Sequence, residues 1–398
     1  MSDTVAAPRP AQAGETTLAI IVALAFSHFV NDIMQSLLTA IYPILKANYG
    51  LDFVQIGLLT FTFQVTASML QPAIGIYTDR HPLPYSLAVG MGSSLVGLII
   101  LGFADSYWLL LLGAACIGLG SAVFHPESSR VARLASGGRH GLAQSLFQVG
   151  GNAGSAAGPL LAAFVVLPRG QASVSWFALA ALIGIFTLWR VGGWYAAHRR
   201  ANAGRPALST VPLFDRRTTV IALLVLTVLT VTKNTYMASL SSYYTFFLIE
   251  RFGVSVQDSQ LLLFAYLGAA AVGVFAGGPI GDRFGAKFVI WFSILGVLPF
   301  TLVLPYADLT WTVALTILIG LIFSSAFPAI VVFAQDLMPG RVGMVAGIFF
   351  GFAFGAGGIA AAGLGAVADV AGIGFVYWLC SFLPLAGLLT VFLPERRR

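Results

Sequence analysis

The chain contains twelve long apolar stretches, each separated from the next by a short polar turn. A transmembrane helix needs about 20 largely apolar residues, and a bilayer leaves the backbone few alternatives to a helix. Only 9% of the 398 residues are charged, against roughly 25% in a soluble domain. We therefore predict an all-α integral membrane protein with twelve transmembrane helices, over residues 17–45, 53–78, 84–104, 107–135, 140–167, 173–197, 218–249, 257–281, 286–306, 309–337, 342–367 and 373–394.

The two halves of the chain repeat each other. The segment GGPIGDRFGAK at 277–287 aligns with IGIYTDRHPLP at 74–84, which places Asp282 over Asp79. A second alignment, at an offset of 202 residues, places Pro328 over Pro126. Duplicated six-helix halves resemble the major facilitator arrangement, in which substrate binds between the halves near the bilayer midplane. This arrangement implies two pseudo-symmetric bundles around one central cavity.

The longest polar stretch, at 198–217, divides the chain nearly in half. We predict five segments: a cytosolic tail over 1–16, a six-helix bundle over 17–197, a cytosolic linker over 198–217, a second six-helix bundle over 218–394 and a cytosolic tail over 395–398.

The distribution of basic residues predicts the orientation in the membrane. If both termini are cytosolic, 17 of the 21 Lys and Arg residues lie on or near the cytosolic side and three lie in outer loops. Cytosolic loops of membrane proteins carry such an excess. We expect a multi-pass protein of a bacterial inner membrane with both ends in the cytosol. The net charge of +6 is dispersed over the loops and does not indicate nucleic-acid binding.

Six ionisable side chains lie inside the apolar stretches. A charge at bilayer depth costs several kcal/mol or more, so it is rarely found without a protein partner, a water-filled cavity or a function. The six are His28 and Asp32 in the first predicted helix, His125, Glu127 and Arg130 in the fourth, and Lys233 in the seventh.

Asp32 is the strongest candidate for proton coupling. It lies mid-helix with no adjacent cation, and burial favours the protonated form of a carboxyl. Glu127 is the second candidate and His28 the third. Each also has a structural interpretation: Asp32 in an interhelical bond, His28 as a satisfied buried histidine, and Glu127 neutralised by Arg130 three residues on.

Lys233 is predicted to bind an anionic group of the substrate, aided by His125 or Arg130. Its alternative partner is Asp32, across the pseudo-twofold axis. Three amide side chains are predicted to contact substrate: Gln35, Gln148 and Asn152. Gln35 lies with His28, Asp32 and Thr39 on one polar stripe of the first predicted helix, which should face the central cavity. Gln148 and Asn152 lie on a second stripe, which could equally join helices. We expect Asp32 and Lys233 to point into the cavity between the bundles.

Two motifs predict gating elements. The pattern GxxxDRxGxK, complete around Asp282 and Arg283, resembles the loop signature of the major facilitator superfamily; the first copy keeps Asp79 and Arg80 but continues with His-Pro. In the fifth predicted helix, a GxxxGP element resembles that of proton-driven drug exporters and is formed by Gly154, Gly158 and Pro159. Small residues at this spacing let helices approach closely, so ordinary helix packing is the alternative interpretation.

A more specific resemblance covers about the whole chain. Three segments are similar to the fosmidomycin resistance protein family of major facilitator exporters: residues 123–160, HFVNDIMQSLLTAIYPILK in the first predicted helix, and LQPAIGIYTDRHP at 70–82. The resemblance implies a proton-driven antiporter that exports small anionic phosphonates such as fosmidomycin.

The main alternative is an importer or symporter of another small metabolite with the same fold. The chain contains no GxxxxGK[ST] loop, no HExxH and no CxxC, so the sequence indicates no ATPase, enzyme, cofactor or metal centre. Expected partners are an anionic small molecule, protons and the lipid bilayer, and a monomer is expected.

Overall fold

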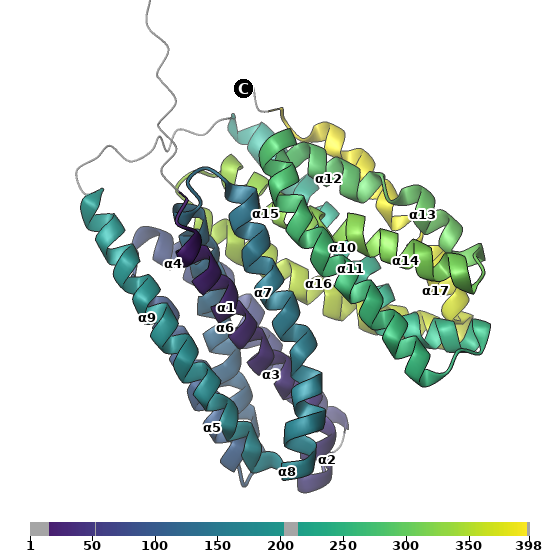
Figure 1. Cartoon of the computed structure of the whole chain (residues 1–398), viewed down its shortest axis with the longest axis horizontal. Helices are drawn as coiled ribbons and strands as arrows, with labels where there is room; N and C mark the ends of the chain where they lie inside the picture. The colour runs from purple at the N-terminus through teal and green to yellow at the C-terminus, as the bar shows by residue number, and fades with distance from the viewer. Residues whose placement is uncertain (1–15, 52, 203–213, 396–398) are drawn as a thin grey trace, which may run out of the picture.

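The computed structural model describes residues 16–51, 53–202 and 214–395, and these residues form two helical bundles (Figure 1). The predicted terminal tails and linker fall largely outside the described residues. The first bundle consists of α1 (Leu18–Ala40), α2 (Tyr42–Tyr49), α3 (Phe53–Gln64), the π-helical η1 (Val65–Met69), α4 (Gln71–Arg80), α5 (Ser86–Phe103), α6 (Tyr107–Ala135), α7 (His140–Leu161), the π-helical η2 (Ala162–Val166), α8 (Leu167–Arg169), the 3-10 helix η3 (Gln171–Phe177) and α9 (Ala178–Ala201).

The second bundle repeats this arrangement. It consists of α10 (Arg216–Phe252), α11 (Val256–Phe284), α12 (Ala286–Leu295), α13 (Leu298–Val303), the 3-10 helix η4 (Leu304–Tyr306), α14 (Leu309–Ser324), α15 (Ala326–Leu337), α16 (Val342–Ala371), α17 (Ile373–Cys380) and the 3-10 helix η5 (Leu383–Phe392). Asp215 begins this bundle by accepting hydrogen bonds from the backbone N–H groups of Arg217 and Thr218, as a helix N-cap does.

Eleven helical stretches of the described residues are long and apolar enough to cross a membrane. The twelfth predicted span, 53–78, is divided into α3, η1 and α4. Proline explains the division, because Pro72 has no N–H to donate to the carbonyl four residues before it. Beside this break, the Gln71 side chain donates to the Ala67 carbonyl oxygen at 2.7 Å.

A proline also separates α14 from α15. The two helices meet at Ser325, three residues before Pro328. In the first bundle the equivalent Pro126 lies inside the continuous helix α6. The duplicated halves therefore differ at this point: one has an unbroken helix and the other has two helices separated at Ser325.

Large apolar side chains cover the outside of both bundles. Trp108 is 77% exposed, Phe164 73% and Val391 72%, although each lies on a helix that packs inward elsewhere. A soluble monomer rarely exposes apolar patches of this extent, whereas a lipid-facing surface requires them.

The two bundles contact each other mainly through α4 with α16 and through α7 with α11. In Figure 1 the bundles meet near the described ends of the chain and diverge away from them. We call the side where the bundles meet the closed end. The start of α1 and the end of α6 lie at this same end, because the Thr17 N–H donates to the Ala135 carbonyl oxygen at 2.8 Å.

Candidate functional site

The polar stripe of α1 faces a cavity within the first bundle. Asp32, Gln35 and Thr39 line a space of about 170 Å³, together with residues of α3, η1, α6 and α7. His28 lies one turn nearer the closed end and is 2% exposed. The cavity therefore lies on the side of Asp32 that faces away from the closed end.

Asp32 is 6% exposed and accepts several hydrogen bonds. Its Oδ1 atom accepts from Asn31 Nδ2 at 3.0 Å and from Gln35 Nε2 at 2.9 Å, and its Oδ2 atom accepts from Ser155 Oγ at 3.3 Å. Gln35 is oriented in turn by Ser121, whose hydroxyl donates to Gln35 Oε1 at 3.0 Å. These contacts fix the carboxyl group at the junction of α1, α6 and α7.

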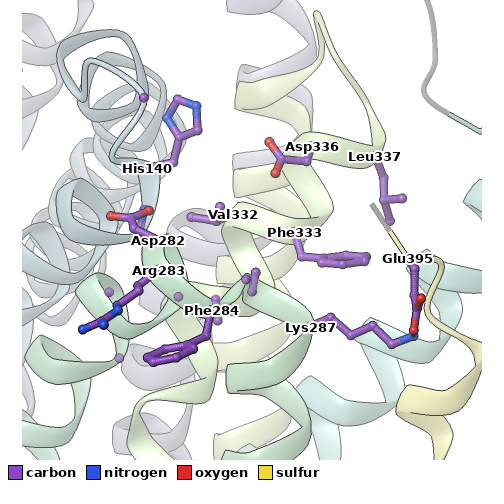
Figure 2. A pocket seen from close by; sticks show the side chains of 18 of the residues that line it. His140, Asp282, Arg283, Phe284, Lys287, Val332, Phe333, Asp336, Leu337 and Glu395 are labelled. Carbon is purple, nitrogen blue, oxygen red and sulfur yellow. The ribbon is translucent and has the colours of Figure 1, made fainter. Parts of the chain in front are cut away.

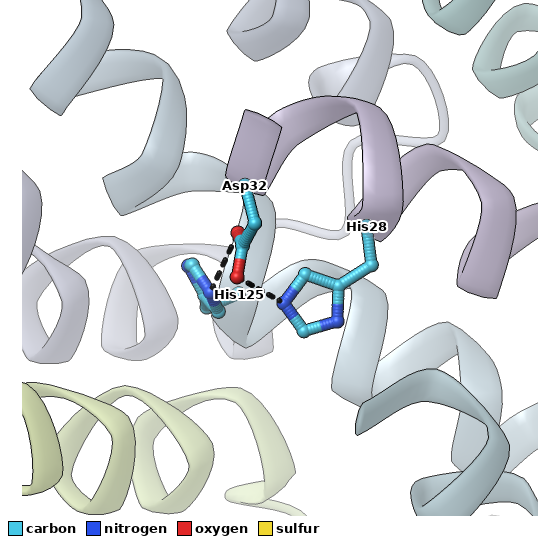
Figure 3. Close-up of side chains that lie close together, drawn as sticks. All are labelled: His28, Asp32 and His125. Carbon is cyan, nitrogen blue, oxygen red and sulfur yellow. Dashed lines mark ion pairs between the residues drawn. The ribbon is translucent and has the colours of Figure 1, made fainter. Parts of the chain in front are cut away.

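Two imidazole rings complete the group around Asp32 (Figure 3). His28 Nε2 lies 3.5 Å from Asp32 Oδ2, and His125 Nε2 lies 4.0 Å from Asp32 Oδ1. One carboxylate oxygen of Asp32 and one ring nitrogen each of His28 and His125 lie within 4.8 Å of one another. This spacing would also admit a small cation. The sequence did not predict that His125 belongs to this group rather than to a substrate site, because the contact joins separate helices.

Backbone carbonyls determine which imidazole nitrogen carries hydrogen. His28 Nδ1 lies 2.7 Å from the Phe147 carbonyl oxygen, and His125 Nδ1 lies 3.0 Å from the Ser121 carbonyl oxygen. A carbonyl oxygen only accepts, so both Nδ1 atoms must donate. When both rings are neutral, the Nε2 atom of each ring therefore directs a lone pair toward the Asp32 carboxylate. The lone pairs and the carboxylate repel one another, and a proton placed between a nitrogen and an oxygen would relieve this repulsion.

Aromatic rings and glycines enclose the group. The Phe147 ring stacks on His28 with centroids 4.1 Å apart, and Phe350 of the second bundle lies 5.1 Å from His125. A Cβ atom on Gly151 would clash with the His28 ring and with Asp32 Oδ2. The close approach of α7 to α1 thus depends on small residues, as the sequence pattern predicted for this helix.

The two glycines of the GxxxGP element lie at the same contact. A Cβ on Gly154 would overlap the Phe29 carbonyl oxygen, and a Cβ on Gly158 would overlap Ser36 Oγ. Pro159 follows within α7, ahead of the π-helical η2. The glycines therefore pack the two helices that carry Asp32 and its neighbours, and their role in gating stays a prediction.

Glu127 and Arg130 form an ion pair with each other, with Arg130 Nη2 2.6 Å from Glu127 Oε2. Arg130 also donates to the Thr78 carbonyl oxygen at 2.6 Å, and its guanidinium lies 5.5 Å from the Tyr195 ring. Glu127 accepts in addition from Ser86. The pair thus joins α6 to α4, α5 and α9. Neither residue lines the Asp32 cavity.

Lys233 is 5% exposed and lies on α10. Its Nζ atom lies 5.9 Å from the Phe323 ring centroid and 5.8 Å from that of Phe327. In the described part of the chain no ion pair joins it to Asp32, and it does not line the Asp32 cavity. The ammonium is therefore buried between aromatic faces, where a cation–π attraction holds it without an anion.

The remaining predicted substrate contacts lie apart from the Asp32 group. Gln148 is half-buried and its Oε1 atom is buried without a hydrogen-bond partner, and Asn152 is exposed. Neither side chain hydrogen-bonds Asp32 or Lys233 among the described residues. Their role as substrate contacts stays a prediction.

At the closed end, Asp79 and Asp282 each bind the start of a helix in the opposite bundle. Asp79 accepts from the backbone N–H groups of Gly343 and Met344, each at 2.9 Å. Asp282 accepts from the N–H groups of Gly141 at 2.8 Å and Leu142 at 2.9 Å. We call these contacts the interbundle caps. A carboxylate at a helix N-terminus satisfies free N–H groups and is attracted by the helix dipole.

Glycine permits these caps to form. A Cβ on Gly75 would overlap the Gly343 carbonyl oxygen, and a Cβ on Gly278 would overlap the Gly141 carbonyl oxygen. The two contacts are equivalent under the internal repeat. The glycine of each GxxxDR motif thus lets the backbones of the two bundles approach closely.

The two arginines of the motifs are exposed, and among the described residues neither forms a hydrogen bond or an ion pair with the opposite bundle. Arg283 lies over the Phe284 ring at 5.3 Å and lines a pocket of about 400 Å³ at the closed end (Figure 2). Lys287 Nζ lies 3.6 Å from Glu395 Oε1 at the edge of the same pocket. The structure thus separates Asp79 and Asp282, which join the bundles, from Arg80 and Arg283.

A further interbundle contact was not predicted. Arg133 on α6 forms an ion pair with Asp336 on α15. Beside it, Gln335 Nε2 donates to Ser129 Oγ at 2.9 Å. Gln335 and Asp336 follow Arg133 by 202 and 203 residues, which are the offsets of the internal repeat. Equivalent residues of two repeats can meet on the symmetry axis, so these offsets could have predicted the contact.

The family model described as Major Facilitator Superfamily matches residues 24–249 and 223–398. The chain belongs to the major facilitator superfamily. It is a multi-pass membrane transporter and not an enzyme. The interbundle caps therefore occur between the two halves of a major facilitator transporter, as the GxxxDR motifs indicated.

Two relatives cover almost all of this transporter. It is 55% identical over 382 residues to the fosmidomycin resistance protein of Escherichia coli strain K12, across 96% of this chain and 94% of the relative. It is 39% identical over 388 residues to the uncharacterized MFS-type transporter YfnC of Bacillus subtilis strain 168, across 97% and 95%. The predicted resemblance to the fosmidomycin resistance protein family is confirmed.

Solved structures confirm the predicted major facilitator fold. The crystal structure of the transporter FucP in the outward conformation superposes with a TM-score of 0.75 at 16% identity, covering 94% of this chain and 99% of that one. At that identity the likeness establishes the fold of the transporter alone.

Proposed function

We propose that the protein is a proton-coupled antiporter that exports small anionic phosphonates such as fosmidomycin. The observation that carries the proton coupling is the Asp32 group, in which two imidazole lone pairs face one carboxyl beside a cavity. The phosphonate substrate is supported by the 55% identity to a protein named for fosmidomycin resistance.

The orientation predicted from the basic residues indicates which end of the structure faces the cytosol. With both termini in the cytosol of a bacterial inner membrane, the closed end is cytosolic. The interbundle caps then close the inner side, and the Asp32 cavity lies toward the outside. In this state Asp32 is placed to take a proton from the outer solution.

Lys233 is the proposed binding site for the anionic group of the substrate. A phosphonate is an anion, and a buried ammonium without an acidic partner attracts one strongly. During the cycle, substrate would bind Lys233 from the cytosol and leave outside, while Asp32 would load a proton outside and release it inside. Glu127 is less suited to this exchange, because its charge is already paired with Arg130.

Drug accumulation in whole cells tests this function. Overexpression in a sensitive bacterium should raise tolerance to fosmidomycin and lower its accumulation, and a protonophore should cancel both effects. Unchanged accumulation, with the protein verified in the membrane, would contradict phosphonate export. Export that persists with the protonophore would instead contradict proton coupling.

A further inference from the structure

A row of aromatic rings connects Lys233 to the Asp32 group across the interface between the bundles. Lys233 Nζ lies 5.8 Å from the Phe327 centroid, and the Phe327 and Phe350 rings meet edge to face at 5.3 Å. Phe350 in turn lies 5.1 Å from the His125 ring. Phe350 therefore contacts a ring that covers the buried ammonium and a ring that faces the carboxyl.

Residue counting along the helices puts Phe350 slightly nearer the closed end than His125. It lies eight residues from the start of α16 at the closed end, or about 12 Å at 1.5 Å per residue. His125 lies ten residues from the end of α6, or about 15 Å from the same end. Phe350 is 1% exposed and also packs against Phe147, whose ring stacks on His28.

Buried polar groups without partners lie on the closed-end side of this ring. Ser128 Oγ and Gln144 Nε2 are buried and form no hydrogen bond with any residue that the structure describes. Ser128 follows His125 by three residues on α6, and Gln144 precedes Phe147 by three on α7, so each lies one turn nearer the closed end. Buried polar groups of this kind bind water when space is available.

We infer that Phe350 is the inner barrier of the proton site, the side chain that separates His28, Asp32 and His125 from the cytosolic end. An aromatic ring offers no hydrogen-bonding atom to carry a proton onward. Since Phe350 belongs to the second bundle and the Asp32 group to the first, movement of the bundles apart removes the barrier and connects the site to the inside. This inference rests on the proposed function.

Truncation of Phe350 should therefore open a water path while the bundles stay together. The vacated space would adjoin the His125 and Phe147 rings, and Ser128 and Gln144 follow one turn nearer the closed end on the same two helices. Protons would then cross without substrate. A larger replacement should leak less than a smaller one, because residual volume decides whether water fits.

Passive proton flux through the full-length protein measures the barrier. Purified variants are reconstituted into liposomes containing a pH-sensitive dye, a pH gradient is imposed with valinomycin and potassium to dissipate the membrane potential, and no substrate is added. Flux should rise in the order Phe350→Leu, Phe350→Val, Phe350→Ala, with the alanine variant at least tenfold above wild type. The graded series keeps the test decisive if the alanine variant fails to reconstitute.

Phe349→Ala is the matched control, because Phe349 lies on the same helix and is buried to 2% exposure. Its flux should stay within about twofold of wild type. The inference is overturned if the Phe350 variants do not leak, or if Phe349→Ala leaks as much. Fosmidomycin-driven proton movement in the wild type is assayed separately, so a failure of the proposed function is distinguished from a failure of the barrier.

Discussion

Asp79 and Asp282 are related by the internal repeat, and each caps the first turn of a helix in the opposite bundle. The two caps use equivalent residues in opposite directions, so each bundle supplies one carboxylate and one helix start. The closed end is therefore held symmetrically, and weakening either cap should shift the transporter toward the state in which the bundles separate there.

Asp79→Asn should open the closed end. The amide removes the carboxylate charge that favours the helix N-terminus, and an isolated cap of this kind contributes about 1 kcal/mol. Pulsed electron paramagnetic resonance between spin labels at Arg200 and Glu395, exposed positions in the two bundles, should show a larger population at long distance. Arg80→Gln, which removes the exposed neighbouring charge, should leave the distribution unchanged. An unaltered distribution in Asp79→Asn would show that this cap does not hold the closed end.

Asp32→Asn should abolish uphill efflux while leaving substrate binding and expression largely intact. The amide resembles the protonated carboxyl permanently, so the exchange of a proton at this position is lost. Efflux against a gradient in inverted vesicles provides the measurement, and Asp105→Asn, at an exposed loop position, provides the control. Normal uphill efflux by Asp32→Asn would exclude Asp32 as the proton-coupling residue.

Lys233→Ala should weaken phosphonate binding at least tenfold, and Lys233→Arg should retain part of the affinity. One hydrogen bond from a charged donor contributes roughly 1.5–3 kcal/mol, which exceeds the 1.4 kcal/mol that corresponds to tenfold. Fosmidomycin titration of purified protein measures the change, with Lys287→Ala at the closed end as the control. Wild-type affinity in both Lys233 variants would assign this lysine a structural role only.

Asp215 should protect the first turn of α10 throughout the neutral and mildly acidic range. The hydrogen bond from Thr218 holds the pKa of the Asp215 carboxyl below its usual range, so the cap is fully present above that range and is lost as pH falls through the lowered pKa. Amide hydrogen exchange at Arg217 and Thr218, corrected for intrinsic rates, should accelerate only at pH values below about 4. Asp215→Ala should show fast exchange at neutral pH, whereas slow exchange there would contradict the cap.

Local pattern was sufficient to predict most of the fold. Continuous apolar stretches determine where helices cross the bilayer, and the repeated GxxxDR motifs identified the two aspartates that join the bundles. The interruption of 53–78 was not predicted, although Pro72 is its cause. Whether a proline bends a helix depends on what its neighbours offer the freed carbonyl, which is a property of packing and not of the sequence nearby.

The candidate site was predicted only in part. The position of Asp32, His28 and Gln35 on one face of a helix follows from their spacing. The partnership of His125 with Asp32 does not, because it depends on how α6 packs against α1. Phe350 carried no signal at all, since a phenylalanine in an apolar helix has the same local pattern whether it faces lipid or a proton site.

The break between α14 and α15 at Ser325 lies beside the Lys233 ammonium. Phe323 precedes the break and Phe327 follows it, and the Lys233 ammonium lies between 5.8 and 5.9 Å from both rings. Cation–π attraction to both rings thus links α14 and α15 across this break. A phosphonate bound to the ammonium, as proposed, would weaken both attractions and loosen the break, in the half of the molecule whose counterpart helix is unbroken.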